Sequence, residues 1–448
     1  MNKDNQLAIN LAKKIDAYGG TTYYVGGYVR DKVLNIKNKD IDIEVFGITP
    51  ELLKDICQQY GVVDEIGESF GILKIHGYDI DISMPRVEHK NGEGHKSFDV
   101  SVDPFMSVGN AAKRRDFTIN SIMENVLTGE HKDPFLGLSD LSNKVLKHID
   151  ETTFVEDPLR VYRAAQFAAR FELTVSPETK ALCSSIDTST LSKERVFEET
   201  NKALLKANRP SIYFSTLREL NQLKSFFPIL YHMIGIEQNP LWHPEGDVWN
   251  HTMEVVDKAA SYKELTTYPL GFMYAALFHD IGKIYATEVD SEIHAYNHEN
   301  IGADNIHNAI DPLTNQKQLM IYVENMVRNH MTPHMISKQS SMRSLNRFFD
   351  KSIAPYDAVL LSIADTINKK EILRFETGWW DKKLEVYREI KTQPEVMGQD
   401  LIDLGYTPGP LFKDILTKCH DIHLAGVNKE NVLRQMKSIV KGIHSRRA

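Results

Sequence analysis

Hydrophobic and polar positions repeat with two different periods along this chain. Up to about residue 147, short runs with the strand period of two lie between helical patterns, and beyond it long helical patterns take over. Near the N-terminus, the apolar positions Leu7, Ile9, Leu11 and Ile15 are interleaved with polar residues, which predicts an amphipathic helix. Thr49-Pro50-Glu51 is typical of a helix start and predicts a second helix. The pattern therefore predicts a mixed N-terminal part followed by an all-helical remainder.

The stretch 23–44, YYVGGYVRDKVLNIKNKDIDIE, is the most informative one. A β-favouring run breaks at Gly26 and Gly27 and continues as a helical pattern, whose free N–H groups can receive phosphate. In the next alternating run, Asp40 and Asp42 share one face, where their carboxylates repel each other unless a cation lies between them. Each feature alone is more simply a tight turn or a solvated acidic strand. Their joint order predicts a phosphate cradle followed by a metal site for nucleotidyl transfer.

Two further strands are predicted over Gly71–Ile75 and Tyr78–Met84, joined at Gly77. Asp79 and Asp81 share one face of the second strand. A third carboxylate beside the first pair is what a two-cation site requires.

Residues 86–113 are polar and contain glycine, so we expect a mobile loop there. Arg114 and Arg115 follow it. Adjacent arginines near acidic strands usually form surface ion pairs, but beside a triphosphate they supply the counter-charge, because a guanidinium matches phosphate oxygens.

Pro158 fits the first turn of a predicted helix that continues to Phe171, with Asp157 and Arg160 three residues apart on one face. This spacing is compatible with an ordinary ion pair inside the helix. It also suits base selection, because Asp only accepts and Arg only donates hydrogen bonds. Cytosine and adenine present an NH₂ group beside an acceptor nitrogen, whereas guanine and uracil would be mismatched with both side chains.

The composition is that of an ordinary globular protein, with 42% hydrophobic and 25% charged residues over 448 positions, enough for about three domains. No apolar run approaches the roughly 20 residues that a membrane span needs. Three widely separated cysteines favour a reducing compartment, most simply the cytoplasm. The net charge of −8 excludes a generally basic surface, although the basic segment 429–447 is equally compatible with RNA contact and with a solvated helix end.

Taken together, these segments resemble the class II tRNA nucleotidyltransferases (CCA-adding enzymes) and their bacterial poly(A) polymerase relatives. The resemblance covers roughly the first 210 residues, in the family's order and spacing. It is carried by GGYVRD (26–31), DID (40–42), RRDFTIN (114–120), DPFLGLSDL (133–141), EDPLRVYRAAQFAAR (156–170) and SKERVFEE (192–199). The segment PEVMGQDLIDLGYTPGPLFKDIL (394–416) also resembles the family's tail.

The resemblance implies an α+β chain with a polymerase-β-like nucleotidyltransferase head followed by an all-α neck, an HD-type body and a tail. The expected boundaries are a head over 1–146, a neck over 147–212, a connector over 213–240, an HD domain over 241–370 and a tail over 371–448.

The resemblance also implies the roles of single residues. Asp40 and Asp42 would bind catalytic Mg²⁺, and Asp81, five residues before Arg86, would be the third carboxylate. Nucleotide-binding residues would be Gly26, Gly27, Arg30, Arg114, Arg115, Asp116, Asp157, Arg160, Arg163 and Arg170. Gln166 departs from the family, in which we expect an arginine, and this puts one phosphate or RNA contact in doubt.

The second half carries another pattern, which resembles the HD-domain metal phosphohydrolases. Its H…HD…H…H…D order consists of His251, His279, Asp280, His298, His330 and Asp365. The resemblance implies one or two cations, Mg²⁺ or a transition metal such as Mn²⁺ or Ni²⁺, and hydrolysis of 2′,3′-cyclic or terminal phosphates. The alternative is an inherited helical scaffold that no longer binds metal.

We therefore expect a cytoplasmic enzyme that adds CCA to tRNA 3′ ends from CTP and ATP, with no membrane partner. Addition of A only, CC only or a poly(A) tail remains open, because these enzymes share the EDxxR helix. Two rivals come from other classes: an HD phosphohydrolase with a non-catalytic RNA-binding head, and a non-catalytic tRNA-binding protein.

Overall fold

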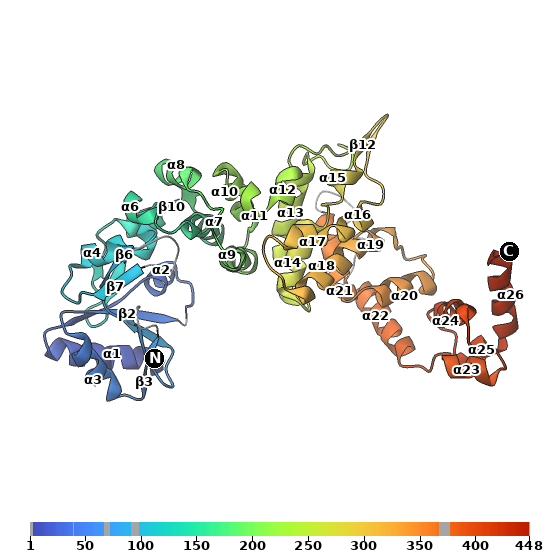
Figure 1. Cartoon of the computed structure of the whole chain (residues 1–448), viewed down its shortest axis with the longest axis horizontal. Helices are drawn as coiled ribbons and strands as arrows, with labels where there is room; N and C mark the ends of the chain where they lie inside the picture. Colours follow the sequence, from blue (N-terminus) through green and yellow to red (C-terminus); the bar gives the residue numbers. More distant parts are fainter. Residues whose placement is uncertain (1–2, 39, 67–71, 91–97, 367–376, 448) are drawn as a thin grey trace. The chain divides into compact units, whose positions relative to one another are not determined.

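The protein is described by a computed structural model covering residues 3–38, 40–66, 72–90, 98–366 and 377–447 (Figure 1). The chain forms two compact units, one of Met1–Leu191 with Glu219–Gln222 and the other of Ser192–Arg218 with Leu223–Ala448. Across the described ranges, every helix is too short or too polar to cross a bilayer.

A seven-stranded sheet in the order β3-β4-β5-β2-β1-β8-β9 forms the centre of the first unit. In β2 the alternation is as predicted, because Ile41 and Ile43 are buried on one face while Asp42 and Glu44 belong to the other. The strands of this unit are β1 (Thr21–Tyr24), β2 (Ile41–Phe46), β3 (Val63–Ile66), β4 (Ile72–Ile75), β5 (Ile80–Ser83), β6 (Arg86–Lys90), β7 (Phe98–Val102), β8 (Met123–Asn125), β9 (His131–Lys132), β10 (Val145–Leu146) and β11 (Thr174–Val175).

Helices α1 and α3 pack beside the sheet. Of the apolar residues predicted for α1, Leu7, Leu11 and Ile15 are buried, whereas Ile9 is only half-buried. Thr49 caps α3, as the sequence predicts, by accepting a hydrogen bond from the N–H of Leu52. The helices of this unit are α1 (Lys3–Ala17), α2 (Gly27–Val33), α3 (Pro50–Gln58), α4 (Val108–Lys113), α5 (Gly137–Ser142), α6 (Glu151–Phe154), α7 (Leu159–Phe171) and α8 (Pro177–Ser185), with a 3₁₀ turn over Thr118–Asn120.

The prediction of a loop over residues 86–113 is wrong where the structure describes it. Strands β6 and β7 pair antiparallel, with Arg86 opposite Val102, and α4 follows, capped by Ser107. The sequence of β6 has Val87 as its single apolar residue, so it shows no apolar alternation. The short alternation of β7 lies next to charged and glycine-rich residues. Residues 91–97 lie outside the described ranges.

The second unit is built around α14, which is apolar on every side and buried along nearly its whole length. Helices α9, α13, α18 and α21 contact it. The elements of this unit's first part are α9 (Lys193–Lys206), α10 (Ser211–Glu219), α11 (Leu223–Phe226), α12 (Pro228–His232), α13 (Val248–Ala260), a 3₁₀ turn (Lys263–Leu265), α14 (Pro269–Phe278), α15 (Lys283–Ala286), β12 (Glu288–Val289), β13 (Ile293–His294), α16 (His298–Asp304), α17 (Ile306–Ile310), α18 (Lys317–Asn329), α19 (Thr332–Met335) and α21 (Pro355–Asp365).

The C-terminal helices have a separate small core in which Leu401, Ile415, Cys419 and Val432 are buried. This core is formed by α23 (Gly398–Asp403), α24 (Pro410–His423), α25 (Lys429–Arg434) and α26 (Met436–Arg447). Helices α20 (Met342–Lys351) and α22 (Thr377–Lys391) precede it in the chain. A sheet-containing first unit and a helical second unit confirm the predicted α+β class.

Candidate functional sites

In the first unit, β2 and β5 run parallel with Asp42 directly beside Asp81. Asp40 is exposed and lies immediately before β2. Burial, together with the charges of Asp81 and Asp40, raises the pKa of Asp42 to about 6. Asp81 thus lies beside Asp42, and the charges of Asp81 and Asp40 both act on the carboxyl group of Asp42.

The oxygens of these three carboxylates do not form a compact group of the kind that surrounds a metal ion. Among the described residues, the sets of three or more His, Cys, Asp or Glu whose ligating atoms lie within 4.8 Å of one another are all in the second unit. Lys74 forms an ion pair with Asp81 at 2.7 Å. The donor set fits Mg²⁺, which prefers carboxylate oxygen and needs few protein ligands.

The glycine pair leaves β1 and opens α2, as the pattern predicts. Gly26 has a φ of 64°, a left-handed conformation that favours glycine. A Cβ atom at this position would also lie 3.1 Å from Nη1 of Arg115. The turn therefore brings a bare backbone close to one of the predicted triphosphate-binding arginines.

Glu44 is a functional candidate to which the sequence analysis assigned no role. Its carboxylate is fully buried and forms ion pairs with Arg114 at 3.0 Å and Arg115 at 3.2 Å. The signal was present in the sequence, since Glu44 follows Asp40 and Asp42 at the same spacing on the same strand face.

A buried polar network connects α2 to α7. Arg30 pairs with Asp31 at 2.6 Å and donates to Asn120, which in turn donates to Asp116 at 2.8 Å. Asp116 is held on its other side by Arg163 at 2.6 Å. The Arg163 charge and these hydrogen bonds outweigh burial and lower the pKa of Asp116, so it remains a carboxylate.

Arg170, the last predicted arginine of α7, contacts Asp31 at 3.4 Å. Near the start of the helix, Arg160 donates to the carbonyl oxygens of Thr153 at 2.7 Å and Arg114 at 2.8 Å. Asp157 lies just before the helix and accepts from the N–H of Leu159. Asp157 thus lies two residues before the helix, although the N–H of Arg160 still donates to the backbone carbonyl oxygen of Asp157 at 3.0 Å.

Gln166, at the position where the family would have arginine, is buried with 1% of its surface exposed. A buried neutral amide here avoids the cost of burying a charge. The position therefore belongs to the core of this unit.

In the second unit, all six residues of the H…HD…H…H…D pattern come together. His279 and His330 follow the C-terminal ends of α14 and α18, and Asp365 ends α21. His251 comes from α13 and His298 from the start of α16. Three helix C-termini, each with partial negative charge, meet here and favour a cation.

Three of the histidines are oriented in the same way. Nδ1 of His279, His298 and His330 lies 2.6–2.8 Å from the backbone carbonyl three residues earlier. Donation from Nδ1 leaves the Nε2 lone pair free to bind a metal. Burial, with the charges of the neighbouring histidines, lowers the pKa of His330 to about 3, so its imidazole is in the neutral, ligating form.

His251 is held differently, by carboxylates on both ring nitrogens. Its Nδ1 lies 2.6 Å from Glu245 and its Nε2 lies 2.8 Å from Asp365. Burial opposes a charge on this ring, but these two hydrogen bonds prevail and raise its pKa to about 9 without metal. A site that retains a proton between carboxylates is one that a divalent cation fits, since the cation would replace that proton.

Gly282 allows α16 to approach this centre. A Cβ atom at position 282 would lie 1.9 Å from the carbonyl oxygen of His298, closer than any side chain allows. The glycine of HDIGK thus permits the contact that brings His298 to Asp280 at 3.3 Å.

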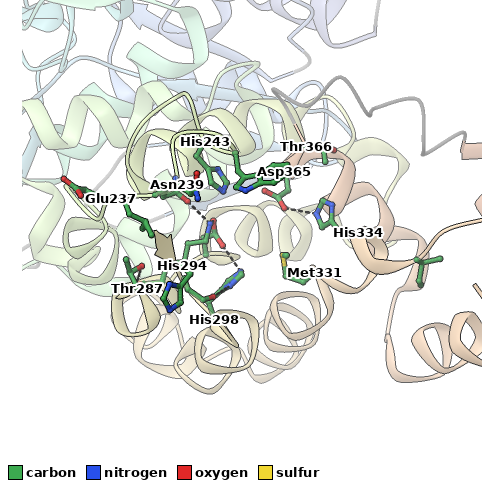
Figure 2. Close-up of a pocket in the computed structure, with 17 residues that line it drawn as sticks. Glu237, Asn239, His243, Thr287, His294, His298, Met331, His334, Asp365 and Thr366 are labelled. Carbon is green, nitrogen blue, oxygen red and sulfur yellow. Dashed lines mark hydrogen bonds and ion pairs between the residues drawn. The ribbon is translucent and has the colours of Figure 1, made fainter. Parts of the chain in front are cut away.

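A cavity of about 330 Å³ adjoins the cluster (Figure 2). It is lined by Asp280, His298 and Asp365 together with residues that the sequence analysis missed. Of these, Lys283 pairs with Asp280 at 2.7 Å and His334 with Asp365 at 2.9 Å. The added lining residues include Trp242, His243, Lys283, His294 and His334. The HDxxK and HxxxH spacings were the available signals.

Comparison with known families gives one match over the carboxylate site of the first unit and another over the histidine cluster of the second unit. A model described as "Poly A polymerase head domain" matches residues 22–147, and "HD domain" matches residues 248–369. A third, "Probable RNA and SrmB- binding site of polymerase A", matches residues 173–233.

Curated relatives match over most of the chain. The chain is 37% identical over 402 residues to the "Multifunctional CCA protein" of Mannheimia succiniciproducens, covering 86% of this chain and 92% of the relative. It is 39% identical over 269 residues to the protein of the same name from Psychromonas ingrahamii, covering 58% and 63%.

Solved structures share the fold at lower identity. The Bacillus stearothermophilus CCA-adding enzyme in complex with CTP matches with a TM-score of 0.71 and 17% identity over 100% of both chains. The Thermotoga maritima CCA-adding enzyme complexed with tRNA matches with a TM-score of 0.64 and 20% identity, covering 97% of this chain and 95% of that one. The head-domain match precedes the HD-domain match, as the two sites do, and the identity extends over 92% of the relative from Mannheimia succiniciproducens. The chain therefore belongs to the multifunctional CCA protein family of nucleotidyltransferases.

Proposed function

We propose that this protein adds C and A from CTP and ATP to the 3′ ends of tRNA, completing the CCA terminus. The observation that carries the proposal is the pairing of Asp42 with Asp81 across parallel strands, next to the bare turn at Gly26 and Arg115. The names of the relatives support it. So do the titles of the structural neighbours bound to CTP, ATP and tRNA.

In this reaction the tRNA 3′-hydroxyl oxygen attacks the α-phosphorus in line and releases its proton to water. The bond between the α-phosphorus and the bridging oxygen breaks, and pyrophosphate leaves with that electron pair. Asp40, Asp42 and Asp81 would hold Mg²⁺, which supplies charge stabilisation to the attacking and leaving oxygens. Arg114 and Arg115 face the triphosphate charge, and Glu44 fixes their positions. Asp157 and Arg160 lie at the start of α7, where we place the incoming base.

The decisive test uses purified protein with three tRNA substrates and each nucleoside triphosphate separately. The substrates lack all of CCA, lack only the terminal A, or are complete. We expect C to be added to the first, A to the second, and nothing to the third. Addition of only A, only CC, or a long A tail identifies the related activities, and no addition supports a non-catalytic head.

Arg160→Ala is expected to increase incorporation of U and G relative to C, because the variant lacks a donor that only C and A match. The ratio of incorporation rates for the four nucleotides measures this. Lys180→Ala, which removes an exposed charge on α8, is the matched control and should leave the ratio unchanged. Equal loss with all four nucleotides would show that Arg160 only holds the carbonyls of Thr153 and Arg114.

Glu44→Gln is expected to raise KM for CTP and ATP together by about tenfold or more, because a hydrogen bond to a charged group contributes roughly 1.5–3 kcal/mol. Two half-buried arginines, Arg114 and Arg115, would lose their shared counter-charge and their fixed orientation. Steady-state kinetics with both nucleotides checks this. An unchanged KM for both would exclude Glu44 as a positioning residue.

We also propose that the HD unit is a metal-dependent phosphohydrolase acting on 2′,3′-cyclic or terminal phosphates of RNA ends. The observation favouring it is the convergence of five predicted ligands, with Asp365 at 2.8 Å from His251, beside a cavity of about 330 Å³, which is within the usual range of small-ligand sites. Mg²⁺, Mn²⁺ or Ni²⁺ bound there would supply Lewis-acid polarisation of the phosphate. Lys283, which lines the cavity, offsets the phosphate charge.

We place both activities in the cytoplasm. All three cysteines are free and buried, which is compatible with a reducing compartment.

A further inference from the structure

We propose that Trp242 stacks on the base of a ribonucleoside 2′,3′-cyclic phosphate bound in the cavity of the HD unit. The proposal rests on the proposed phosphohydrolase function and names the part of the substrate that this site recognises. The wall of the cavity joins a charged part to an exposed aromatic ring. A nucleotide combines the same two chemistries, because it carries a phosphate at one end and a flat aromatic base at the other.

The lining of the cavity has two parts of different chemistry (Figure 2). Asp280, Lys283 and Asp365 belong to the charged part, at which the phosphate is bound in the proposed reaction. The other part is apolar and comprises Trp242, Ile293, Ala295, Met331 and Ile336. A phosphate gains nothing from apolar surface, so this second part indicates a substrate that also carries an apolar group.

Trp242 differs from the other tryptophans of the chain in its exposure. Trp249 and Trp380 are buried and Trp379 is half-buried, whereas 60% of the surface of Trp242 is exposed. Covering an exposed aromatic ring is favourable, so a ligand that lies against Trp242 gains this free energy. Because Trp242 lines the same cavity as Asp280, the substrate of the HD centre is the ligand placed to cover it.

The backbone around Trp242 is held in one turn by Asn239. The carbonyl oxygen of Asn239 accepts hydrogen bonds from the N–H groups of Trp242 at 3.0 Å and His243 at 2.9 Å. Its side-chain Oδ1 accepts a third hydrogen bond, from the N–H of Leu241 at 3.0 Å. The indole ring is therefore presented on a pre-organised turn, which lowers the conformational entropy lost on binding.

His243 connects this turn to the histidine cluster. Its ring centroid lies 4.7 Å from that of His251. Both rings have Nδ1 within hydrogen-bonding distance of the same oxygen of Glu245, at 3.0 and 2.6 Å. Consecutive Cα atoms are about 3.8 Å apart, so Trp242 is one residue from a ring in contact with the cluster. A single nucleotide can thus reach from the indole ring to the charged part of the cavity.

Recognition by stacking predicts a particular kind of selectivity. Every base has a flat aromatic face, so an indole ring accepts all four bases and does not read their hydrogen-bonding edges. We therefore expect the HD unit to hydrolyse ribonucleoside 2′,3′-cyclic phosphates of any base. It should distinguish them from cyclic phosphates that carry no base.

The test compares the full-length protein with Trp242→Leu on two substrates, with whichever of Mg²⁺, Mn²⁺ or Ni²⁺ supports hydrolysis. Adenosine 2′,3′-cyclic phosphate carries a base, and methyl riboside 2′,3′-cyclic phosphate has a methoxy group in its place. We expect the variant to raise KM for the adenosine substrate by about five- to hundredfold, the usual effect of removing one base–aromatic stack. KM for the base-free substrate should be unchanged.

Two further variants separate stacking from a general disturbance of the cavity. Trp242→Phe keeps an aromatic ring and should restore most of the affinity for the adenosine substrate. Tyr231→Leu is the matched control, because it removes an exposed aromatic ring of α12 that does not line the cavity, and it should leave both KM values unchanged. An unchanged KM for adenosine 2′,3′-cyclic phosphate in Trp242→Leu, or an equal rise for both substrates, would overturn the proposal.

A short oligoribonucleotide that ends in a 2′,3′-cyclic phosphate identifies the source of the base. A rise in KM for this substrate in Trp242→Leu would assign the stacking site to RNA ends. A rise confined to the free nucleotide would assign it to mononucleotides.

Binding is measured separately, so that the result does not depend on hydrolysis. All 4 tryptophans belong to the second unit, and quenching of their fluorescence by adenosine 3′-monophosphate therefore reports on this unit alone. We expect quenching in the parent protein and little in Trp242→Leu. Such quenching without hydrolysis of any cyclic phosphate would refute the phosphohydrolase function alone. Hydrolysis with a KM that does not depend on Trp242 would refute the stacking site alone.

Discussion

Asp42→Asn is expected to lower the rate of nucleotide addition by about a thousandfold or more, because a lost metal ligand removes several kcal/mol of charge stabilisation and each 1.36 kcal/mol is a factor of ten. Asp42 pairs with Asp81 on the neighbouring parallel strand, so it lies at the centre of the carboxylate set. Single-turnover addition of C to a tRNA lacking CCA, with saturating Mg²⁺, measures the loss.

The same variant should be more stable than the parent when no divalent cation is present. The folded state raises the pKa of Asp42 to about 6, so the fold favours the protonated acid and the carboxylate costs stability at neutral pH. This loss in the free energy of unfolding is complete above pH 6, and it disappears as the pH falls toward the pKa of Asp42 in the unfolded chain, near 4. Thermal melting in chelator should therefore show a gain for Asp42→Asn at pH 7.5 that shrinks by pH 5.

Asp64→Asn is the matched control, since Asp64 is an exposed acid on β3 of the same sheet. It should retain full activity and show no comparable stabilisation. Substantial Mg²⁺-dependent addition by Asp42→Asn would contradict the assignment of the metal site.

Local sequence patterns were enough to predict those parts of the head in which the strand or helix period determines which way a side chain points. The alternation of Ile41 and Ile43 with Asp42 fixed the faces of β2, and the glycine pair fixed the change from strand to helix. That Asp81 is the register partner of Asp42 depends on a parallel pairing between distant segments, which periodicity cannot supply. The resemblance to a family implied Asp81 as the third carboxylate but did not predict this register.

The features that the sequence analysis missed depend on tertiary contacts. The interaction of Glu44 with Arg114 and Arg115 joins residues about seventy positions apart, and no local spacing predicts it. Strands β6 and β7 are stabilised by pairing with each other, so their polar composition was misleading. Asp157 was placed within a helix because Pro158 suits a first turn, whereas the helix begins at Leu159.

The six predicted ligands of the HD unit illustrate a different limit of prediction from sequence. Their residue types and order were visible in the sequence, but their joint position results from helix ends that meet where α14 ends. Glu245 and His334, which hold His251 and Asp365, lie outside the pattern and have meaning only in three dimensions. Residues that orient metal ligands are thus harder to recognise from sequence than the ligands themselves.

His279→Ala and Asp280→Ala are each expected to abolish hydrolysis of 2′,3′-cyclic phosphates, with a loss of about a hundredfold or more, because each removes a metal ligand at the centre of the buried cluster. In the parent protein the activity should require added Mn²⁺, Ni²⁺ or Mg²⁺ and stop with chelator.

Nucleotide addition should persist in both variants, because the head carboxylates belong to the other compact unit and share no ligand with this cluster. His307→Ala, on the exposed side of α17, is the control and should retain both activities. If the parent shows no hydrolysis with any of the three metals, or if the two variants hydrolyse as fast as the parent, the HD unit is a helical support for the polymerising half.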